Sequence, residues 1–270
     1  MKTSLGNPST ASEVLFEQYL TQHGYSGWSH EKPIEGKPTT PDYRLPFNNA
    51  DLVFEVKEFD APPPSSAEQA AHDGYRPIRE KITSAARQFK HYKEFSCSLV
   101  LANPKFATVD LDTLETVFGA MLGNFGYRAD FGVPVGTDNP LVPVFTTGGK
   151  MVDRRRSTPQ NSTFSSIIVL SYYPLRHKVR ETELGRELTF HEVAGVANGR
   201  PVFDSDPIRV AVYENPFRRI PLPEEVFCGP FDERWRKDGD LILPIYFGEE
   251  LRRIEAHWRS AIGVDGPVDS

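Results

Sequence analysis

Three charged residues in the first quarter of the chain have the types and spacing to hold a divalent cation. Glu55 and Lys57 lie two apart within the apolar run LVFEVKEF, and Asp42 follows Pro41 about a hairpin's length earlier. Residues two apart on a strand point to the same face of a sheet. A charge inside a buried strand costs several kcal/mol unless it is paired or binds a metal.

Carboxylates and an ammonium in this arrangement predict a particular chemistry. Two carboxylates from adjacent strands form a hard oxygen site, which suits Mg²⁺ or Mn²⁺. An ammonium farther along the same face can orient a water molecule or offset charge on a phosphate. Two alternatives also fit the pattern: Glu55 and Lys57 on the solvated face of an edge strand, and Asp42 as an ordinary turn residue after proline.

The elements that must position these residues can be read from hydrophobic periodicity and turn residues. Pro- and Gly-containing turns separate the strands, and the third and fourth strands are apolar enough to be buried on both faces. The expected elements, in chain order, are a helix over 10–23, strands over 27–34, 42–45 and 52–59, a helix over 77–94, a strand over 97–103 and a helix over 111–122.

The first two helices each have a predicted cap or an apolar stripe. In the first helix Ser12 is the expected N-cap, and its apolar face is expected to hold Val14, Leu15, Tyr19 and Phe16. In the second helix the predicted buried stripe is Ile78, Ile82, Ala85 and Phe89.

The second half of the chain has a weaker signal. Strands are predicted over 163–173 and 207–213, and the segment 214–235 is predicted to be irregular because of its prolines and aromatic residues. A closing amphipathic helix is expected over 249–262. The segment 61–74, rich in Pro, Ser and Ala, is expected to be a loop.

Pro41-Asp42, followed by Glu55-Val56-Lys57, in the order helix, three strands, helix, strand, resembles the PD-(D/E)XK nuclease superfamily. The resemblance covers residues 10–103. It implies an α/β fold with a restriction-endonuclease-like core, a mixed sheet in the order αβββαβ, which we place at 1–125. Residues 126–270 are then expected to form a β-rich extension that packs on the core.

The resemblance also implies roles for individual residues. Asp42 and Glu55 would bind Mg²⁺ or Mn²⁺, with the Val56 carbonyl as a further ligand, and Lys57 would position or activate the attacking water. An acidic residue on the first helix is common in the family, and Glu17 or Glu13 could fill that position; we favour Glu17. Some subfamilies place Gln-x-x-x-Tyr on the second helix, and the residues at that spacing are Gln88 and Tyr92.

The second helix also carries basic residues that could contact nucleic-acid phosphates. Lys81, Arg87 and Lys90 are the candidates, although a solvated charged helix face is the alternative interpretation. The resulting expectation is a metal-dependent nuclease that hydrolyses phosphodiester bonds, with DNA as its expected substrate. The second half would supply substrate contacts or the surface of a homodimer. The alternatives are a non-cleaving nucleic-acid-binding protein on the same fold and an interaction protein that assembles through its second half.

Composition limits the class of protein. The 270 residues carry a net charge of -6, so nucleic-acid binding would need a local basic patch. Two distant cysteines argue against a disulfide framework or a cysteine zinc site. The beginning of the chain lacks the apolar core of a secretory signal, and the sequence has no membrane-length apolar run. We therefore expect a cytoplasmic protein without a membrane partner.

Overall fold

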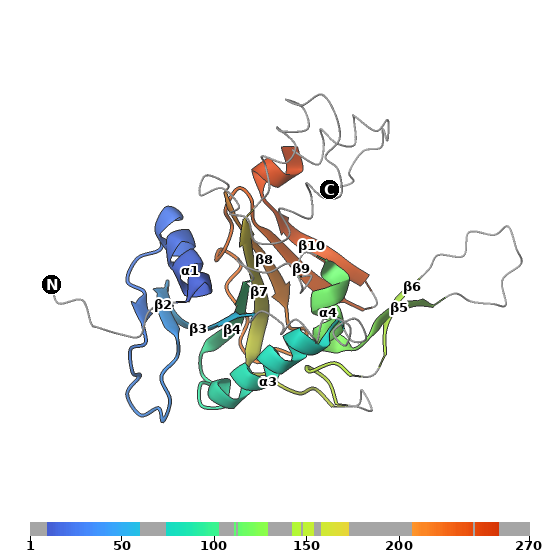
Figure 1. The fold of residues 1–270 in the computed structure, drawn as a ribbon, viewed down its shortest axis with the longest axis horizontal. Coiled ribbons are helices and arrows are strands. Elements are labelled where there is room, and N and C mark those ends of the chain that lie inside the picture. The colour runs from blue at the N-terminus through green and yellow to red at the C-terminus, as the bar shows by residue number, and fades with distance from the viewer. Residues whose placement is uncertain are drawn as a thin grey trace, which may run out of the picture.

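The fold is mixed α/β, with helices packed against one large mixed sheet (Figure 1). The computed structural model describes residues 10–59, 74–102, 111, 113–128, 142–146, 148–153, 158–172, 207–239 and 241–253. In chain order its elements are α1 (Ala11–Gln22), β1 (Ser29–His30), β2 (Tyr43–Phe47), β3 (Ala50–Glu58), α3 (Arg76–Phe89), β4 (Ser96–Ala102), α4 (Leu114–Leu122), β5 (Phe125–Arg128), β6 (Val142–Phe145), β7 (Phe164–Tyr172), β8 (Ile208–Glu214), β9 (Glu233–Asp238) and β10 (Leu241–Phe247).

Within the described part of the chain, eight strands form one sheet in the order β1-β2-β3-β4-β7-β8-β9-β10, and β5 pairs with β6 separately. The first three strands are antiparallel, whereas β3, β4 and β7 run parallel to one another. Strands from the second half therefore continue the sheet that the first half begins. The domain boundary near residue 125 stays a prediction.

Helices cover both faces of this sheet. Alternate residues of β3 enter different cores, because side chains on a strand alternate between faces. Val53 packs with Ile82 of α3 and Phe118 of α4, whereas Phe54 packs with Phe16 of α1. The helix α1 therefore lies on one face, and α3 and α4 lie on the other.

The helix α1 begins at a different cap and turns a different face inward from those predicted. Thr10 caps the helix by accepting from the Glu13 N–H, and the Glu13 carboxylate accepts from the Thr10 N–H in return. Ser12 instead lies buried in the first turn. Leu20 is buried in place of Val14, whose side chain is 43% exposed. The packing of α1 on the sheet fixes this rotation, and local sequence does not reveal it.

The helix α3 is shorter at its C-terminal end than the sequence predicts. The predicted buried stripe is correct, but α3 ends at Phe89 rather than at residue 94. The His91 N–H bonds to the Gln88 carbonyl and the Tyr92 N–H to the Phe89 carbonyl, three residues back in each case. This tightened last turn directs the chain into β4, so Tyr92 lies beyond the helix.

The other element boundaries show where the sequence signal was incomplete. The first strand is only two residues long, and Asp42 lies just before β2 rather than inside it. Both β9 and β10 were missed, β9 because its sequence ERWRKD is charged. Of the predicted closing helix, the described residues 249–253 are helical and the rest lies outside the described chain. The predicted loop 61–74 also lies almost entirely outside it.

No helix in the part of the chain that the structure covers is long and apolar enough to cross a membrane.

Candidate active site

The Asp42 carboxylate lies where β2 separates from β3. The backbone pairing between these strands ends at Tyr43 opposite Phe54. One residue earlier, the Asp42 carbonyl accepts from the Glu31 N–H at 2.8 Å. The Asp42 side chain turns to β3, where its Oδ2 accepts from the Val56 N–H at 2.8 Å. A carboxylate thus takes the place of a backbone acceptor at the edge of β3.

Glu55 and Lys57 join Asp42 in one hydrogen-bonded cluster. The Lys57 Nζ donates to Glu55 Oε2 at 2.9 Å and to Asp42 Oδ2 at 3.2 Å. The Glu55 side chain is fully buried, whereas those of Lys57 and Asp42 are 23% and 18% exposed. The cluster therefore reaches from the sheet interior to the surface, with an ammonium in contact with both carboxylates.

The helix α3 contributes Gln88 to the buried end of this cluster. With its amide nitrogen facing β3, Gln88 donates to both oxygens of the Glu55 carboxylate, at 2.6 Å to Oε1. Glu55 points to the α3 face because it shares the alternation of Val53, which packs against that helix. Gln88 thus gives the buried carboxylate a second donor besides Lys57.

Burial changes the protonation behaviour of the cluster. Burial first, and then the neighbouring Asp42 carboxylate, raise the pKa of Glu55 to about 8, although the Lys57 ammonium opposes this shift. Burial alone lowers the pKa of Lys57, but the Glu55 and Asp42 carboxylates outweigh it and raise that pKa above its usual value. The Glu55 carboxylate and the Lys57 ammonium, which are hydrogen-bonded at 2.9 Å, therefore influence each other's protonation.

Tyr92 contacts the segment that leads into Asp42 rather than the carboxylates themselves. Its hydroxyl donates to the Thr39 carbonyl and accepts from the Thr39 hydroxyl. Burial raises the pKa of Tyr92, the Thr39 hydrogen bond lowers it, and the Glu55 charge raises it. Tyr92 therefore fixes the turn three residues before Asp42, which sequence spacing alone did not indicate.

The oxygen atoms around Lys57 are of the kind that a hard divalent cation prefers. Asp42 and Glu55 offer carboxylate oxygens. The N–H and C=O of a strand residue point to the same edge, so the Val56 carbonyl faces the side of β3 from which its N–H reaches Asp42. In the described part of the chain, no three His, Cys, Asp or Glu side chains group as metal ligands. The groups that could hold Mg²⁺ or Mn²⁺ at this position are the two carboxylates and, by strand geometry, the Val56 carbonyl.

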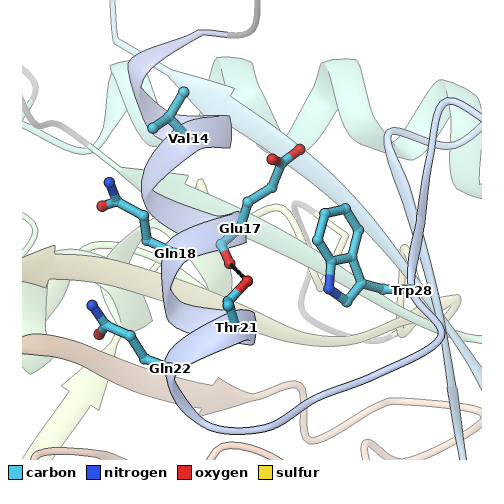
Figure 2. A pocket seen from close by; sticks show the side chains of 6 residues that line it. All are labelled: Val14, Glu17, Gln18, Thr21, Gln22 and Trp28. Atoms are coloured by element: carbon cyan, nitrogen blue, oxygen red, sulfur yellow. Dashed lines mark hydrogen bonds between the residues drawn. The ribbon is translucent and has the colours of Figure 1, made fainter. Parts of the chain in front are cut away.

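Glu17 lies on the other face of the sheet from Glu55. Its Oε1 accepts from the Tyr43 hydroxyl at 2.9 Å. Figure 2 shows its carboxylate and the Trp28 indole on the same side of α1. Glu17, Trp28 and Val14 are among the residues that line a surface hollow of about 380 Å³. The predicted role of Glu17 beside the metal thus has no direct contact to support it and stays a prediction.

Glu13, the alternative to Glu17, has structural partners of its own. It completes the cap of α1, and its carboxylate lies 3.8 Å from the His30 Nε2. The same helix end is held by a residue that sequence reasoning missed. Glu58 Oε2 accepts from the N–H and hydroxyl of Ser12 at 3.0 and 3.2 Å, which anchors α1 to the end of β3. A general rule could have indicated this contact from the sequence, because a carboxylate is stabilised beside the N-terminus of a helix.

The predicted phosphate-contacting residues do not share one face. Counting 100° per residue from the buried stripe of α3, Lys81 and Gln88 lie on one flank, Arg87 points away from the core, and Lys90 lies on the opposite flank. Arg87 and Lys90 are exposed. The Lys81 Nζ lies 5.6 Å from the centre of the Phe59 ring. Of the three, Lys81 is therefore on the side of the Glu55 cluster.

The chain has no significant match among known protein families, curated proteins or solved structures.

Proposed function

We propose that the protein is a divalent-metal-dependent nuclease that hydrolyses phosphodiester bonds in DNA. The observation that carries this proposal is the contact of Asp42, Glu55 and Lys57 at the edge of β3. Oxygen ligands for a hard cation and an ammonium within 3.2 Å of them are the groups that phosphoryl transfer needs. A restriction-endonuclease-like arrangement of the first six elements, from α1 to β4, is part of the proposal.

Each residue of the cluster has a proposed task. Asp42, Glu55 and the Val56 carbonyl would hold Mg²⁺ or Mn²⁺, and the chemistry that such an ion supplies is a polarised phosphate and a water of lowered pKa. Lys57 donates to the phosphate or to the attacking water and offsets the charge that grows in the transition state. Gln88 orients Glu55 through its amide.

The test is a cleavage assay on linear, circular and single-stranded DNA and on RNA, each with Mg²⁺, with Mn²⁺ and with a chelator. Cleavage that requires the metal and is lost in Asp42→Asn supports the proposal, and the preferred substrate identifies the nucleic acid. Cleavage of RNA alone would replace DNA as the substrate and leave the chemistry in place. Cleavage of none of these substrates would overturn the proposal.

A second candidate is an interaction protein, and the edge strand β10 favours it. Leu241, Leu243 and Ile245 are 57%, 39% and 38% exposed, which is high for large aliphatic side chains. Exposed apolar patches on soluble proteins mark contact surfaces. Sedimentation analysis of the parent and of Leu241→Ser/Leu243→Ser tests this candidate, because an assembly through β10 dissociates in the variant.

A further inference from the structure

The Lys57 ammonium stands between the two carboxylates that would hold a divalent cation. Its Nζ lies 2.9 Å from Glu55 Oε2 and 3.2 Å from Asp42 Oδ2. Glu55 Oε2 and Asp42 Oδ2 are the oxygens that converge on one point, so a cation shared by the two carboxylates would bind where the ammonium lies. We propose that Lys57 and the divalent cation are alternative occupants of one position, so that metal binding releases the Lys57 side chain.

Charge balance makes the two occupants exclusive. With both carboxylates ionised, a divalent cation neutralises Asp42 and Glu55 by itself, and an ammonium kept beside it would be repelled. Solvent screens this repulsion weakly, because Glu55 is fully buried. The ammonium therefore moves away when the cation enters.

The surroundings allow Lys57 to leave without unpairing its neighbours. Asp42 Oδ2 keeps the hydrogen bond from the Val56 N–H at 2.8 Å, and Glu55 keeps the amide of Gln88. The Lys57 side chain is 23% exposed and has a flexible four-carbon stem. The exchange thus requires a side-chain movement and no backbone rearrangement.

This inference rests on the proposed function and assigns that site a form of control. Without the metal, the Lys57 ammonium is hydrogen-bonded to both carboxylates. In the metal-bound state the same ammonium is free to meet a phosphate beside the cation. Lys57 is then available for catalysis only after the metal has bound, which couples the assembly of the site to its activation.

The test combines calorimetry of Ca²⁺ binding with the chemical reactivity of individual lysines. The protein is trace-labelled with acetic anhydride at fixed pH, with and without Ca²⁺, and each lysine is quantified by peptide mass spectrometry. Release from two carboxylates and repulsion by the cation lower the Lys57 pKa, and a decrease of about one unit raises its reactive free amine about tenfold. The exposed Lys90 and Lys93 are internal controls, expected to stay within about twofold because neither is hydrogen-bonded to Asp42 or Glu55 in the described part of the chain.

The Asp42→Asn variant provides the matched control, in which both the Ca²⁺ heat and the Ca²⁺-induced increase at Lys57 disappear. Ca²⁺ binding to the parent with unchanged Lys57 reactivity would overturn the exchange and leave the proposed metal site standing. An equal Ca²⁺-induced increase in Asp42→Asn would also overturn the exchange. The absence of any Ca²⁺ heat in the parent would overturn both the exchange and the metal site.

Discussion

The Asp42 carboxylate accepts the backbone N–H of Val56 at 2.8 Å, so a side chain completes the hydrogen bonding of β3 where β2 has separated from it. This contact ties the position of Asp42 to the strand that carries Glu55 and Lys57. It also gives Asp42 a structural task that can be separated from metal binding.

Two substitutions of Asp42 separate these tasks. Asp42→Asn keeps an oxygen acceptor for the Val56 N–H, so the melting temperature should stay near that of the parent while cleavage is abolished. Asp42→Ala removes the acceptor and should lower the free energy of unfolding by about 1–3 kcal/mol. Thermal melts and cleavage rates of both variants check this prediction. Equal destabilisation by Asn and Ala would contradict the assigned hydrogen bond.

Glu55 should make stability fall as pH rises through neutrality. Its folded pKa of about 8 lies above its value in the unfolded chain, so the folded state holds a proton that the unfolded state has released. The stability from this proton is fully present below the unfolded pKa and is lost as pH rises through about 8. Glu55→Gln lacks this dependence, so the variant should gain stability on the parent as pH rises from about 5 to about 9, by up to about 4 kcal/mol.

The measurement is urea unfolding of the parent and Glu55→Gln across that pH range, with a chelator present. Parallel stability curves would show that Glu55 titrates in the folded state as it does in the unfolded chain.

The strand alternation predicted much of this cluster from the sequence. The two-residue spacing of Glu55 and Lys57 fixes one face, and the hairpin brings Asp42 beside them. The two-residue period of the strand does not reveal the rotation of α1 about its own axis where it packs on the sheet. That rotation is set by contacts distant in sequence, such as Ser12 with Glu58, and it carries Glu17 to Tyr43.

The strand β9 illustrates a second limit of local reasoning. Its sequence is charged, yet Arg234 is buried and its Nε lies 3.7 Å from the buried Glu214 at the end of β8. The segment becomes a strand because β8 supplies both the backbone partner and the opposite charge. Neither partner is close enough in sequence to appear in a periodicity pattern.

Lys57→Ala should remove turnover while nucleic-acid affinity stays close to that of the parent. A single ammonium at the reacting phosphate matters most in the transition state, so the single-turnover rate should fall by about 10²-fold or more. Gel-shift titrations in Ca²⁺ measure affinity without cleavage. Unchanged turnover in this variant would show that the lysine has no part in the chemistry.

Neutralising Arg87 and Lys90 should have the opposite effect on binding and turnover. Both side chains are exposed, and neither lies on the side of α3 that faces the Glu55 cluster, so any phosphate they contact is away from the reacting one. A phosphate that they no longer neutralise keeps its counterions. The double alanine variant should bind nucleic acid more weakly. The slope of log affinity against log salt concentration should become shallower by about one to two, and the cleavage rate of bound substrate should stay near that of the parent. Lys237→Ala on β9 is the matched surface control, and an equal decrease in affinity there would indicate a nonspecific charge effect.

The central claim is that the Asp42, Glu55 and Lys57 cluster cleaves nucleic acid with a bound metal. The most direct test incubates supercoiled plasmid and a single-stranded RNA with the parent and with Glu55→Gln, at equal concentration, in Mg²⁺ and in chelator. The proposal predicts that the parent cuts only in Mg²⁺ and that Glu55→Gln, folded as judged by its melt, cuts neither substrate. Cleavage by Glu55→Gln at the parent rate, or intact substrates with the parent at every Mg²⁺ and Mn²⁺ concentration, would contradict it.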